Sequence, residues 1–215
     1  MGHMIEQVAL LRGHEIVCTI DIGDEEKFES ATFRSADVAI EFTTPQTAET
    51  NVRRAWEQGV PVVCGTTGWD AQALIVESRK SKVESGKEML IWSSNFSVGV
   101  NIFFELNKWL AEVIRNYPQY QPHIYEEHHI HKLDKPSGTA KTLRNDILSV
   151  AAPLNGDASL NDVPIESVRE GEIPGNHSVI WDSPEDTIVI SHMAKGREGF
   201  ALGAVLAAES LNAKP

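Results

Sequence analysis

The segment DVAIEFTTPQTAETNVRRAWEQGVPVVCGTTG, residues 37–68, predicts a strand, a helix and a second strand in direct succession. The short apolar run Asp37–Phe42 is of the strand type. Gln46–Gln58 has helical character and stops at Gly59, and Val60–Cys64 has the composition of a buried strand. Apolar strands joined by a helix are typical of a parallel sheet covered on both faces, so we expect an α/β fold.

The sequence on either side of this segment extends the pattern. The first part of the chain is expected to contain a helix over 5–11, a strand over 15–20, a polar surface loop over 23–35, a helix over 70–81 and a strand over 89–92. The chain therefore opens inside a helix, and strands and helices alternate as far as residue 92.

After residue 96 the pattern changes. Apolar residues at helical spacing predict a long amphipathic helix marked by Ile102, Leu106, Trp109, Leu110 and Val113. The remaining elements expected are strand 121–127, helix 138–150, loop 153–162, strands 165–169, 177–181 and 187–192, and a final helix over 200–211. Strands joined by Gly and Pro turns are typical of an antiparallel or mixed sheet.

Composition excludes several classes of protein. The 215 residues are 41% hydrophobic and 23% charged, as in ordinary globular proteins. A net charge of −12 disfavours nucleic acid and anionic membrane surfaces as partners. Because Cys18 and Cys64 have neither disulfide density nor metal-ligand spacing, a reducing cytoplasm is the expected compartment. The start of the chain is not a signal peptide, and no run approaches the roughly 20 apolar residues of a membrane helix.

The densest polar segment is EEHHIHKLDKPSGTA, residues 126–140. Its imidazoles titrate near neutral pH and its ammonium groups supply fixed positive charge, which suits an anionic ligand that also needs protons moved. Pro-Ser-Gly-Thr before a helix adds backbone N–H groups that bind carboxylate or phosphate. Each part also has a plainer interpretation: a metal site on His128, His129 and His131, helix capping by Ser137 and Thr139, or a solvated charged face.

Two further loops follow buried strands. Gly65-Thr66-Thr67-Gly68 and Ser93-Ser94-Asn95-Phe96 come directly after strands of the expected parallel sheet, where ligands bind in open α/β sheets. Asp21 follows an earlier run, at a position where an acid binds the ribose hydroxyls of a dinucleotide. Taken alone, Gly65–Gly68 could be only a turn and Asp21 only a loop residue.

Together these segments resemble the 4-hydroxy-tetrahydrodipicolinate reductase family, whose signature is E-x-H-H-x-x-K-x-D-x-P-S-G-T-A. Further blocks agree in order, namely EFTTP, VCGTTGW, SSNFSVGVN and ISHMAKGREGFALGAVLAAESL. The resemblance implies a Rossmann-like nucleotide-binding domain over 1–96 plus 197–215. It implies an inserted α+β substrate-binding and oligomerisation domain over 97–196, and a cytoplasmic homotetramer assembled through the strands between Ile165 and His192.

The same resemblance implies reduction of 4-hydroxy-tetrahydrodipicolinate to tetrahydrodipicolinate by NADH or NADPH, in lysine and diaminopimelate biosynthesis. His128 and Lys132 would be catalytic, His129, Gly138 and Thr139 would bind the cyclic dicarboxylate substrate, and no metal is implied. The implied cofactor-binding residues are Gly2, Asp21, Gly65, Thr66, Thr67, Ser93, Ser94, Asn95 and Phe96. An acid at Asp21 favours NADH, although Lys27 or Arg34 could offset its charge.

The beginning of the chain departs from the family pattern. Family members open with a strand and a G-x-x-G-x-x-G/A loop, whereas here only Met1-Gly2 stand where that loop should end. A missing central strand would leave neighbouring strand edges unpaired. A misassigned start site, a truncation or a degenerate family member would each explain this difference.

Three other functions compete with the reductase. A degenerate family member would bind dicarboxylate without turnover. A metal-dependent hydrolase would use His128, His129 and His131. A different Rossmann oxidoreductase would act on an amino acid, but it would not need the His-His-x-x-Lys and Pro-Ser-Gly-Thr pair.

Overall fold

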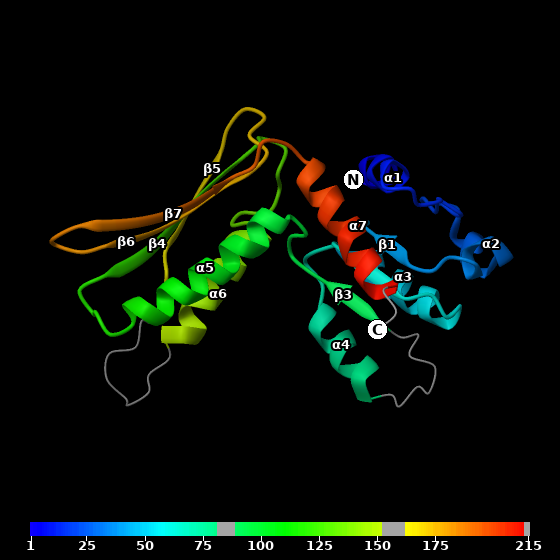
Figure 1. The fold of residues 1–215 in the computed structure, drawn as a ribbon, viewed down its shortest axis with the longest axis horizontal. Coiled ribbons are helices and arrows are strands. Elements are labelled where there is room, and N and C mark those ends of the chain that lie inside the picture. The colour runs from blue at the N-terminus through cyan, green and yellow to red at the C-terminus, as the bar shows by residue number, and fades with distance from the viewer. Residues whose placement is uncertain (81–88, 152–161, 213–215) are drawn as a thin grey trace. The chain divides into compact units, whose positions relative to one another are not determined.

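The computed structural model describes residues 1–80, 89–151 and 162–212. The chain divides into two compact units (Figure 1), unit 1 being residues 1–97 with 200–215 and unit 2 being residues 98–199. Among the described residues, no helix is both long and apolar enough to cross a membrane. The loop expected over 153–162 lies almost wholly outside the described residues.

Unit 1 is built on a three-stranded parallel sheet. Its strands, β1 (Ala39–Glu41), β2 (Val62–Cys64) and β3 (Leu90–Trp92), lie in the order β1-β2-β3. Both pairings are parallel, with Ile40 opposite Val63 and Val63 opposite Ile91. The parallel sheet expected from the strand–helix–strand segment is therefore confirmed.

Helices cover both faces of this sheet, because β2 is apolar on both sides. Val62 and Cys64 pack with α3 (Pro45–Glu57) and with Leu74 of α4 (Ala71–Lys80). Val63 points to the other face, where it packs with α1 (Gly2–Leu11) and α7 (Glu198–Asn212). All three β2 residues are buried, as expected for a central strand with helices above and below.

Two expectations in unit 1 are wrong. Residues 15–20 form no strand, because no neighbouring strand among the described residues supplies a hydrogen-bonding ladder. The polar segment 23–35 is not a plain loop: it contains a 3-10 helix, η1 (Glu25–Glu29), and a short helix, α2 (Ala31–Arg34). Buried Phe28 and Phe33 anchor these turns edge to face, with ring centroids 5.0 Å apart.

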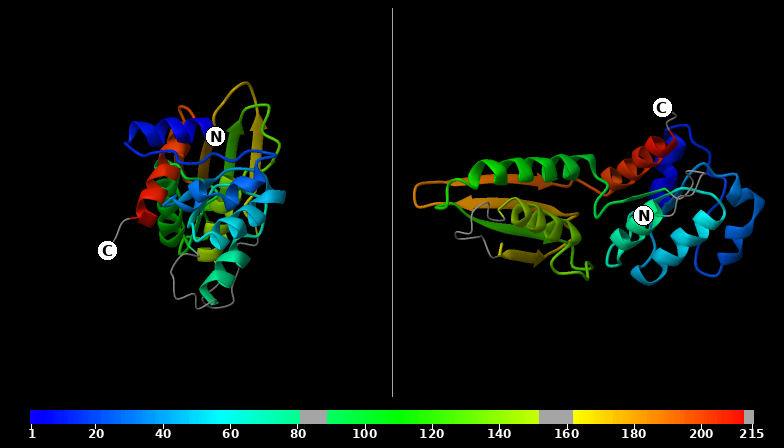
Figure 2. Two further views of the ribbon diagram at one scale, coloured as in Figure 1. Left: turned by 90° about the vertical axis from the view of Figure 1, so that its right-hand side faces the viewer. Right: turned by 90° about the horizontal axis from the view of Figure 1, so that it is seen from below.

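Unit 2 is a mixed four-stranded sheet with two helices on one face (Figure 2). The strands β4 (Gln121–His128), β5 (Ile165–Arg169), β6 (Asn176–Asp182) and β7 (Thr187–Met193) lie in the order β5-β4-β6-β7. The β4–β5 pair is parallel and the others are antiparallel. The expected mixed sheet is confirmed, and the helices are α5 (Val98–Ile114) and α6 (Gly138–Ala151).

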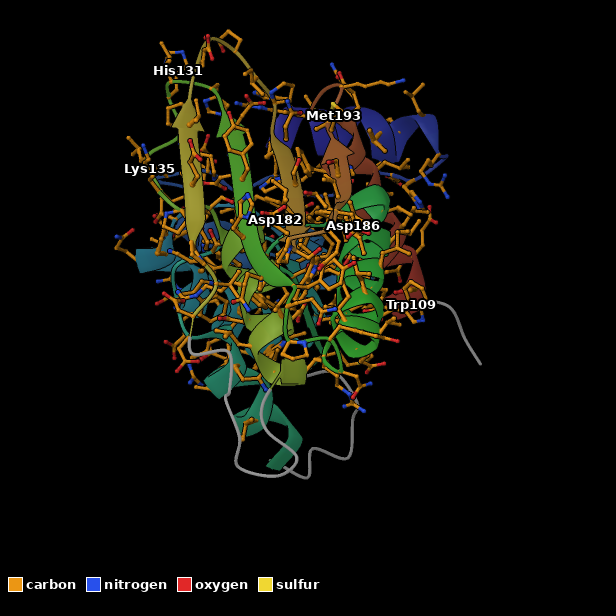
Figure 3. All side chains as sticks on the ribbon, turned by 90° about the vertical axis from the view of Figure 1, so that its left-hand side faces the viewer. Trp109, His131, Lys135, Asp182, Asp186 and Met193 are labelled. Carbon is orange, nitrogen blue, oxygen red and sulfur yellow. The ribbon has the colours of Figure 1, made fainter. Side chains whose placement is uncertain are left out.

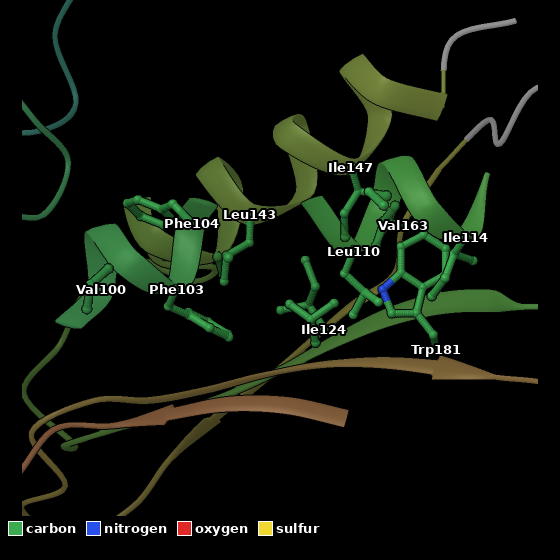
Figure 4. Close-up of a cluster of buried hydrophobic side chains, with 13 residues drawn as sticks. Val100, Phe103, Phe104, Leu110, Ile114, Ile124, Leu143, Ile147, Val163 and Trp181 are labelled. Carbon is green, nitrogen blue, oxygen red and sulfur yellow. The ribbon is translucent and has the colours of Figure 1, made fainter. Parts of the chain in front are cut away.

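The buried face of α5 is not the face marked by the sequence pattern. The core of unit 2 (Figure 4) takes from α5 the side chains of Val100, Phe103, Phe104, Leu110, Ala111 and Ile114. Of the residues that marked the helix, only Leu110 is buried; Ile102, Leu106, Trp109 and Val113 are exposed (Trp109 is labelled in Figure 3). This helix has two apolar stripes, so helical spacing alone cannot tell which one faces the sheet.

Side chains on the helix-covered face of the sheet form rows across the strands. Ile124 pairs with Ile165 and with Val179, and Val179 pairs with Ile190, giving an apolar row under α5 and α6. The next row, two residues away on each strand, is polar. It consists of Ser167, Glu126, His177 and His192. The core therefore changes from apolar to polar at the end of β4.

Candidate functional site

Glu126 is the centre of this polar row and its side chain is fully buried. Its Oε1 accepts hydrogen bonds from the backbone N–H of Ser137 at 3.1 Å and from Nη2 of Arg169 at 3.1 Å. Its Oε2 lies 3.5 Å from Nε2 of His177 and 3.6 Å from Nδ1 of His128. One carboxylate thus contacts a loop, a neighbouring strand and two imidazoles.

The environment keeps Glu126 ionised. Burial alone would raise the pKa of its carboxyl, but hydrogen bonds from His177, Ser137 and Ser167 outweigh burial and hold that pKa well below its ordinary value. The guanidinium of Arg169, itself largely buried, neutralises the charge. Glu126 is therefore an acceptor only, and its neighbours must supply the protons.

His128 lies two residues further along β4, on the same face of the sheet, and is also buried. Burial, and next the proximity of His177, lower the pKa of its imidazole to about 4, with Glu126 opposing the shift. His128 is thus neutral at pH 7 before any anion binds. A Cβ added at Gly175 would lie 3.1 Å from Nε2 of His128, so a glycine there leaves room for the ring.

The loop that follows β4 carries Lys132 and is fastened by Arg169. The Arg169 guanidinium donates to the backbone carbonyls of Lys132, at 3.3 Å, and of Asp134, at 2.5 Å. Nζ of Lys132 forms an ion pair with Asp134 at 2.6 Å. Burial opposes ionisation of Asp134, but Lys132 and the Gly138 N–H outweigh it and lower the pKa of the Asp134 carboxyl. The Asp134 carboxylate therefore occupies the position at which an anionic ligand would contact Lys132 and the Gly138 N–H.

Helix α6 begins at the end of this loop. Ser137 caps it, since its Oγ accepts from the N–H of Ala140 at 3.1 Å, which confirms the capping interpretation for that residue. Gly138 and buried Thr139 form the first turn, so the positive end of a 14-residue helix points toward the loop. The structure thereby brings His128, Lys132, Gly138 and Thr139 together around Glu126 and Arg169.

The other two histidines of the motif turn to different partners. Nε2 of His129 lies 2.9 Å from Nη2 of Arg197, and Nε2 of His131 lies 3.0 Å from Glu172. Both histidines are on the loop side of the site, and His131 is exposed. The metal site considered on His128, His129 and His131 is therefore wrong for the described residues.

A different triad, Glu126, His128 and His177, does have metal-compatible spacing, with its ligand atoms within 4.8 Å of one another. The Arg169 guanidinium, however, already lies 3.1 Å from this carboxylate and supplies the compensating positive charge. A metal ion would be repelled by that guanidinium, so we assign no metal here.

In unit 1 the predicted cofactor loops meet at the carboxyl ends of the strands. The Thr66 carbonyl accepts from the indole N–H groups of Trp69 and Trp92, each at 2.8 Å. Oγ1 of Thr66 accepts from the N–H of Thr43 at 2.9 Å, which ties the end of β2 to the end of β1. Thr66 and the loop after β3 are thus held at one edge of the sheet.

The other loop residues at the carboxyl ends of the unit 1 strands supply hydroxyl, amide and aromatic groups. Ser93 Oγ donates to the Asn95 carbonyl at 2.7 Å, and Oδ1 of Asn95 accepts from the Ser97 N–H at 2.9 Å. The rings of Phe42 and Phe96 pack in a tilted arrangement with centroids 6.0 Å apart, and a Cβ on Gly65 would overlap the Phe42 ring. Aromatic rings beside hydroxyl and amide groups suit the ribose and nicotinamide of a dinucleotide.

The Cys64 thiol beneath this edge takes no part in such binding. It is fully buried and donates to Glu41 at 2.8 Å. Burial, and next the charge of Glu41, raise the pKa of the thiol, so it stays protonated and unreactive.

Asp21 and Gly2 stand apart from that edge in the contacts they make. Asp21 is exposed on a turn, where its carboxylate accepts from the N–H of Ile22 at 2.8 Å. Gly2 opens α1 with free space around it. Lys27 pairs with Asp24 at 2.5 Å and Arg34 donates to Gln58 at 2.8 Å, so neither offsets the Asp21 charge by direct contact.

Sequence reasoning assigned no role to Glu126, Arg169 or His177. The period-two pattern of a strand could have found Glu126, since it shares a face with His128 at the next position but one. Arg169 and His177 come from strands more than 40 residues away from Glu126 along the chain, and only the register of the sheet brings them to it.

Comparison with known proteins agrees with this layout. The family profile described as dihydrodipicolinate reductase, N-terminus, matches residues 1–96, and the one described as dihydrodipicolinate reductase, C-terminus, matches residues 99–215. The 4-hydroxy-tetrahydrodipicolinate reductase of Christiangramia forsetii is 43% identical over 100% of this chain and 89% of its own length. The Archaeoglobus fulgidus enzyme of the same name is 32% identical over 97% and 89%, respectively.

Solved structures support the fold. The dipicolinate-bound dihydrodipicolinate reductase from Paenisporosarcina sp. TG-14 has a TM-score of 0.70 at 21% identity, covering 98% of this chain and 89% of that one. GenD2 from gentamicin A biosynthesis, in complex with NAD, has a TM-score of 0.55 at 11% identity, covering 98% and 76%.

Proposed function

This chain belongs to the dihydrodipicolinate reductase family, and we propose that it reduces 4-hydroxy-tetrahydrodipicolinate to tetrahydrodipicolinate with NADH or NADPH, as a step of lysine and diaminopimelate biosynthesis. The main support is the set of contacts around one buried carboxylate–guanidinium pair, Glu126 and Arg169. Glu126 lies beside His128 and accepts from the N-cap of α6, and Arg169 holds the loop that carries Lys132. This arrangement brings two cationic side chains and several hydrogen-bond donors together in a chain of net charge −12.

The substrate would bind to unit 2 through its carboxylates. We assign one carboxylate to the N–H groups of Gly138 and Thr139, at the positive end of α6, and we place His129 beside the substrate. Asp134 supports this assignment, because its own carboxylate already interacts with the Gly138 N–H and with Lys132. A substrate carboxylate would take over these donors.

The cofactor would bind to unit 1 and supply the hydride. The residues we assign to it are Gly2, Asp21, Gly65, Thr66, Thr67, Ser93, Ser94, Asn95 and Phe96. Hydroxyl, amide and aromatic groups after β2 and β3 suit the ribose and nicotinamide. The exposed Asp21 carboxylate favours NADH, since it would repel the 2′-phosphate of NADPH.

The proton required after hydride addition would come from Lys132. The 4-hydroxyl leaves the ring as water, and the hydride then adds to the unsaturated ring that remains. A nearby ammonium stabilises the negative charge that develops on this ring and then donates a proton. His128 is neutral in the ligand-free protein, so its first role is to hold the substrate by a hydrogen bond. A bound dianion would raise the pKa of His128 and allow it to share in the proton transfer.

We also propose that unit 2 assembles the chain into a homotetramer. The face of its sheet opposite the helices is open and bears exposed Val189 and Met193 (Met193 is labelled in Figure 3). The compartment we propose is the cytoplasm, where the two free cysteines would stay reduced. Light scattering should give a mass four times that of the 23.7 kDa chain, and a monomer would refute the assembly.

Two substitutions test the catalytic assignment. Lys132→Ala should lower kcat by roughly 100-fold or more, since it removes the proton donor, and His128→Gln should also lower kcat. Binding of NADH, measured by fluorescence titration, should change less than about twofold because both residues lie in unit 2. Lys135→Ala, on the same loop, is the matched control and should keep kcat. Equal losses of turnover and NADH affinity would contradict these roles.

A further inference from the structure

The two imidazoles beside Glu126 approach it in a specific way. Both face the same carboxylate oxygen, His128 through Nδ1 at 3.6 Å and His177 through Nε2 at 3.5 Å. Nδ1 of His128 is buried and has no hydrogen-bond partner among the described residues, so this oxygen is the acceptor toward which it points. Catalytic hydrogen bonds are often long before a ligand binds and shorten in the complex.

The charge state of Glu126 decides which nitrogens carry protons. An ionised carboxylate can only accept, so an imidazole nitrogen that faces it is stabilised as N–H. For neutral His128 this places the proton on Nδ1 and leaves a lone pair on Nε2. For His177 it places the proton on Nε2, which also lies 3.2 Å from Oγ of Ser137.

We propose that Glu126 is a positioning residue that holds His128 as the Nδ1–H tautomer, so that Nε2 is the nitrogen presented to the substrate. The same carboxylate orients His177 and, with Arg169, the loop that carries Lys132. The effect of Glu126 on turnover rests on the proposed reductase function, whereas the assignment of the His128 tautomer does not.

The charged and titratable groups packed around His128 together determine the pKa of its imidazole. Arg169 of β5, His177 of β6 and Lys132 of the loop all lower the pKa of His128, and Glu126 raises it. On β7, His192 faces His177 rather than His128. Neutralising Glu126 therefore removes the main negative charge beside His128 and its preference for a proton on Nδ1.

Nitrogen-15 NMR of histidine-labelled protein at pH 7.5 tests the proposal without reference to activity. Signals of His128 are assigned by their loss in His128→Gln. The wild-type protein should show His128 protonated on Nδ1, and Glu126→Gln should abolish this preference. Glu127→Gln, on the opposite face of the same strand, is the matched control and should leave the tautomer unchanged. A wild-type His128 protonated on Nε2, or an unchanged tautomer in Glu126→Gln, would overturn the proposal.

Kinetics of the full-length enzyme then test the positioning role. Glu126→Gln should lower kcat roughly 10- to 100-fold, while Glu126→Asp, which keeps the charge, should retain more activity and the wild-type tautomer. If Glu126→Gln does not fold, Glu126→Asp and the wild-type spectrum still decide the matter. A wild-type protein that shows the predicted tautomer but no NADH oxidation would refute the proposed reaction and leave the tautomer assignment standing.

Discussion

At the scale of single residues, the charge state of each buried group in the site depends on its buried neighbours. Glu126 stays ionised because Arg169 and several hydrogen-bond donors surround it. His128 stays neutral because it is buried and lies near His177, Lys132 and Arg169. Removing one member would leave a buried charge uncompensated, which costs far more than the net strength of the pair. The residues that touch substrate therefore depend on residues that do not.

The low pKa of His128 predicts that acid destabilises the protein. Its folded pKa of about 4 lies below the ordinary value of 6.5, so the unfolded chain takes up this proton first as the pH falls. Between pH 7.5 and pH 5 this group alone should reduce the free energy of unfolding by about 2 kcal/mol. Glu126 loses its stabilising charge only at lower pH, because its pKa is depressed.

Urea unfolding at these two pH values measures the effect. His128→Gln should lose about 2 kcal/mol less than the wild type on acidification. His3→Gln, at a fully exposed histidine, is the control and should follow the wild type. If His128→Gln retains the full pH dependence, His128 is not the buried neutral group described.

The resemblance of the motif to the family signature predicted His128, Lys132, Gly138 and Thr139 as parts of one site. Residues this close in sequence at a strand–loop–helix junction also stay close in space. The sequence did not reveal Glu126, Arg169 and His177 as the buried partners of these residues. Arg169 and His177 meet Glu126 only through strand register, which a single sequence does not specify.

At the scale of elements, the sequence predicted most helices and strands, and the errors have physical causes. Residues 15–20 have strand composition but no ladder partner among the described residues. Helix α5 has two apolar stripes, and spacing pointed mainly to the exposed one. Strand composition and helical periodicity are local properties, whereas pairing and burial depend on the rest of the chain.

One close contact between elements yields a sharp prediction. A Cβ added at Gly203 of α7 would lie 1.6 Å from the carbonyl oxygen of Phe96, which belongs to the predicted cofactor loop. Gly203→Ala must therefore push the helix from the loop, and we expect it to cost about 1–3 kcal/mol of stability and to weaken NADH binding. The readouts are urea unfolding and NADH titration.

The control for the stability measurement is Gly2→Ala, where an added Cβ meets nothing within 4 Å. It should change the free energy of unfolding by less than about 0.5 kcal/mol. A Gly203→Ala variant as stable as the wild type would show that α7 does not pack against Phe96 in this way.

At the scale of the whole molecule, the two units carry complementary chemistry. The strand ends of unit 1 offer hydroxyl, amide and aromatic groups, and the polar end of the unit 2 sheet offers cations, imidazoles and a helix N-terminus. A net charge of −12 disfavours anions in general, yet Lys132, Arg169 and the N-terminus of α6 lie together at one site of unit 2. The proposed reaction uses both units, one for the hydride donor and one for the dicarboxylate.

The most direct test of the account is NADH oxidation by the purified chain, followed at the nicotinamide absorbance band while dihydrodipicolinate synthase supplies the substrate. We predict steady oxidation that requires the synthase product, persists in the presence of a chelator and nearly disappears in Lys132→Ala. A folded chain that binds NADH and dipicolinate but shows no oxidation beyond the rate without substrate would contradict the proposed function.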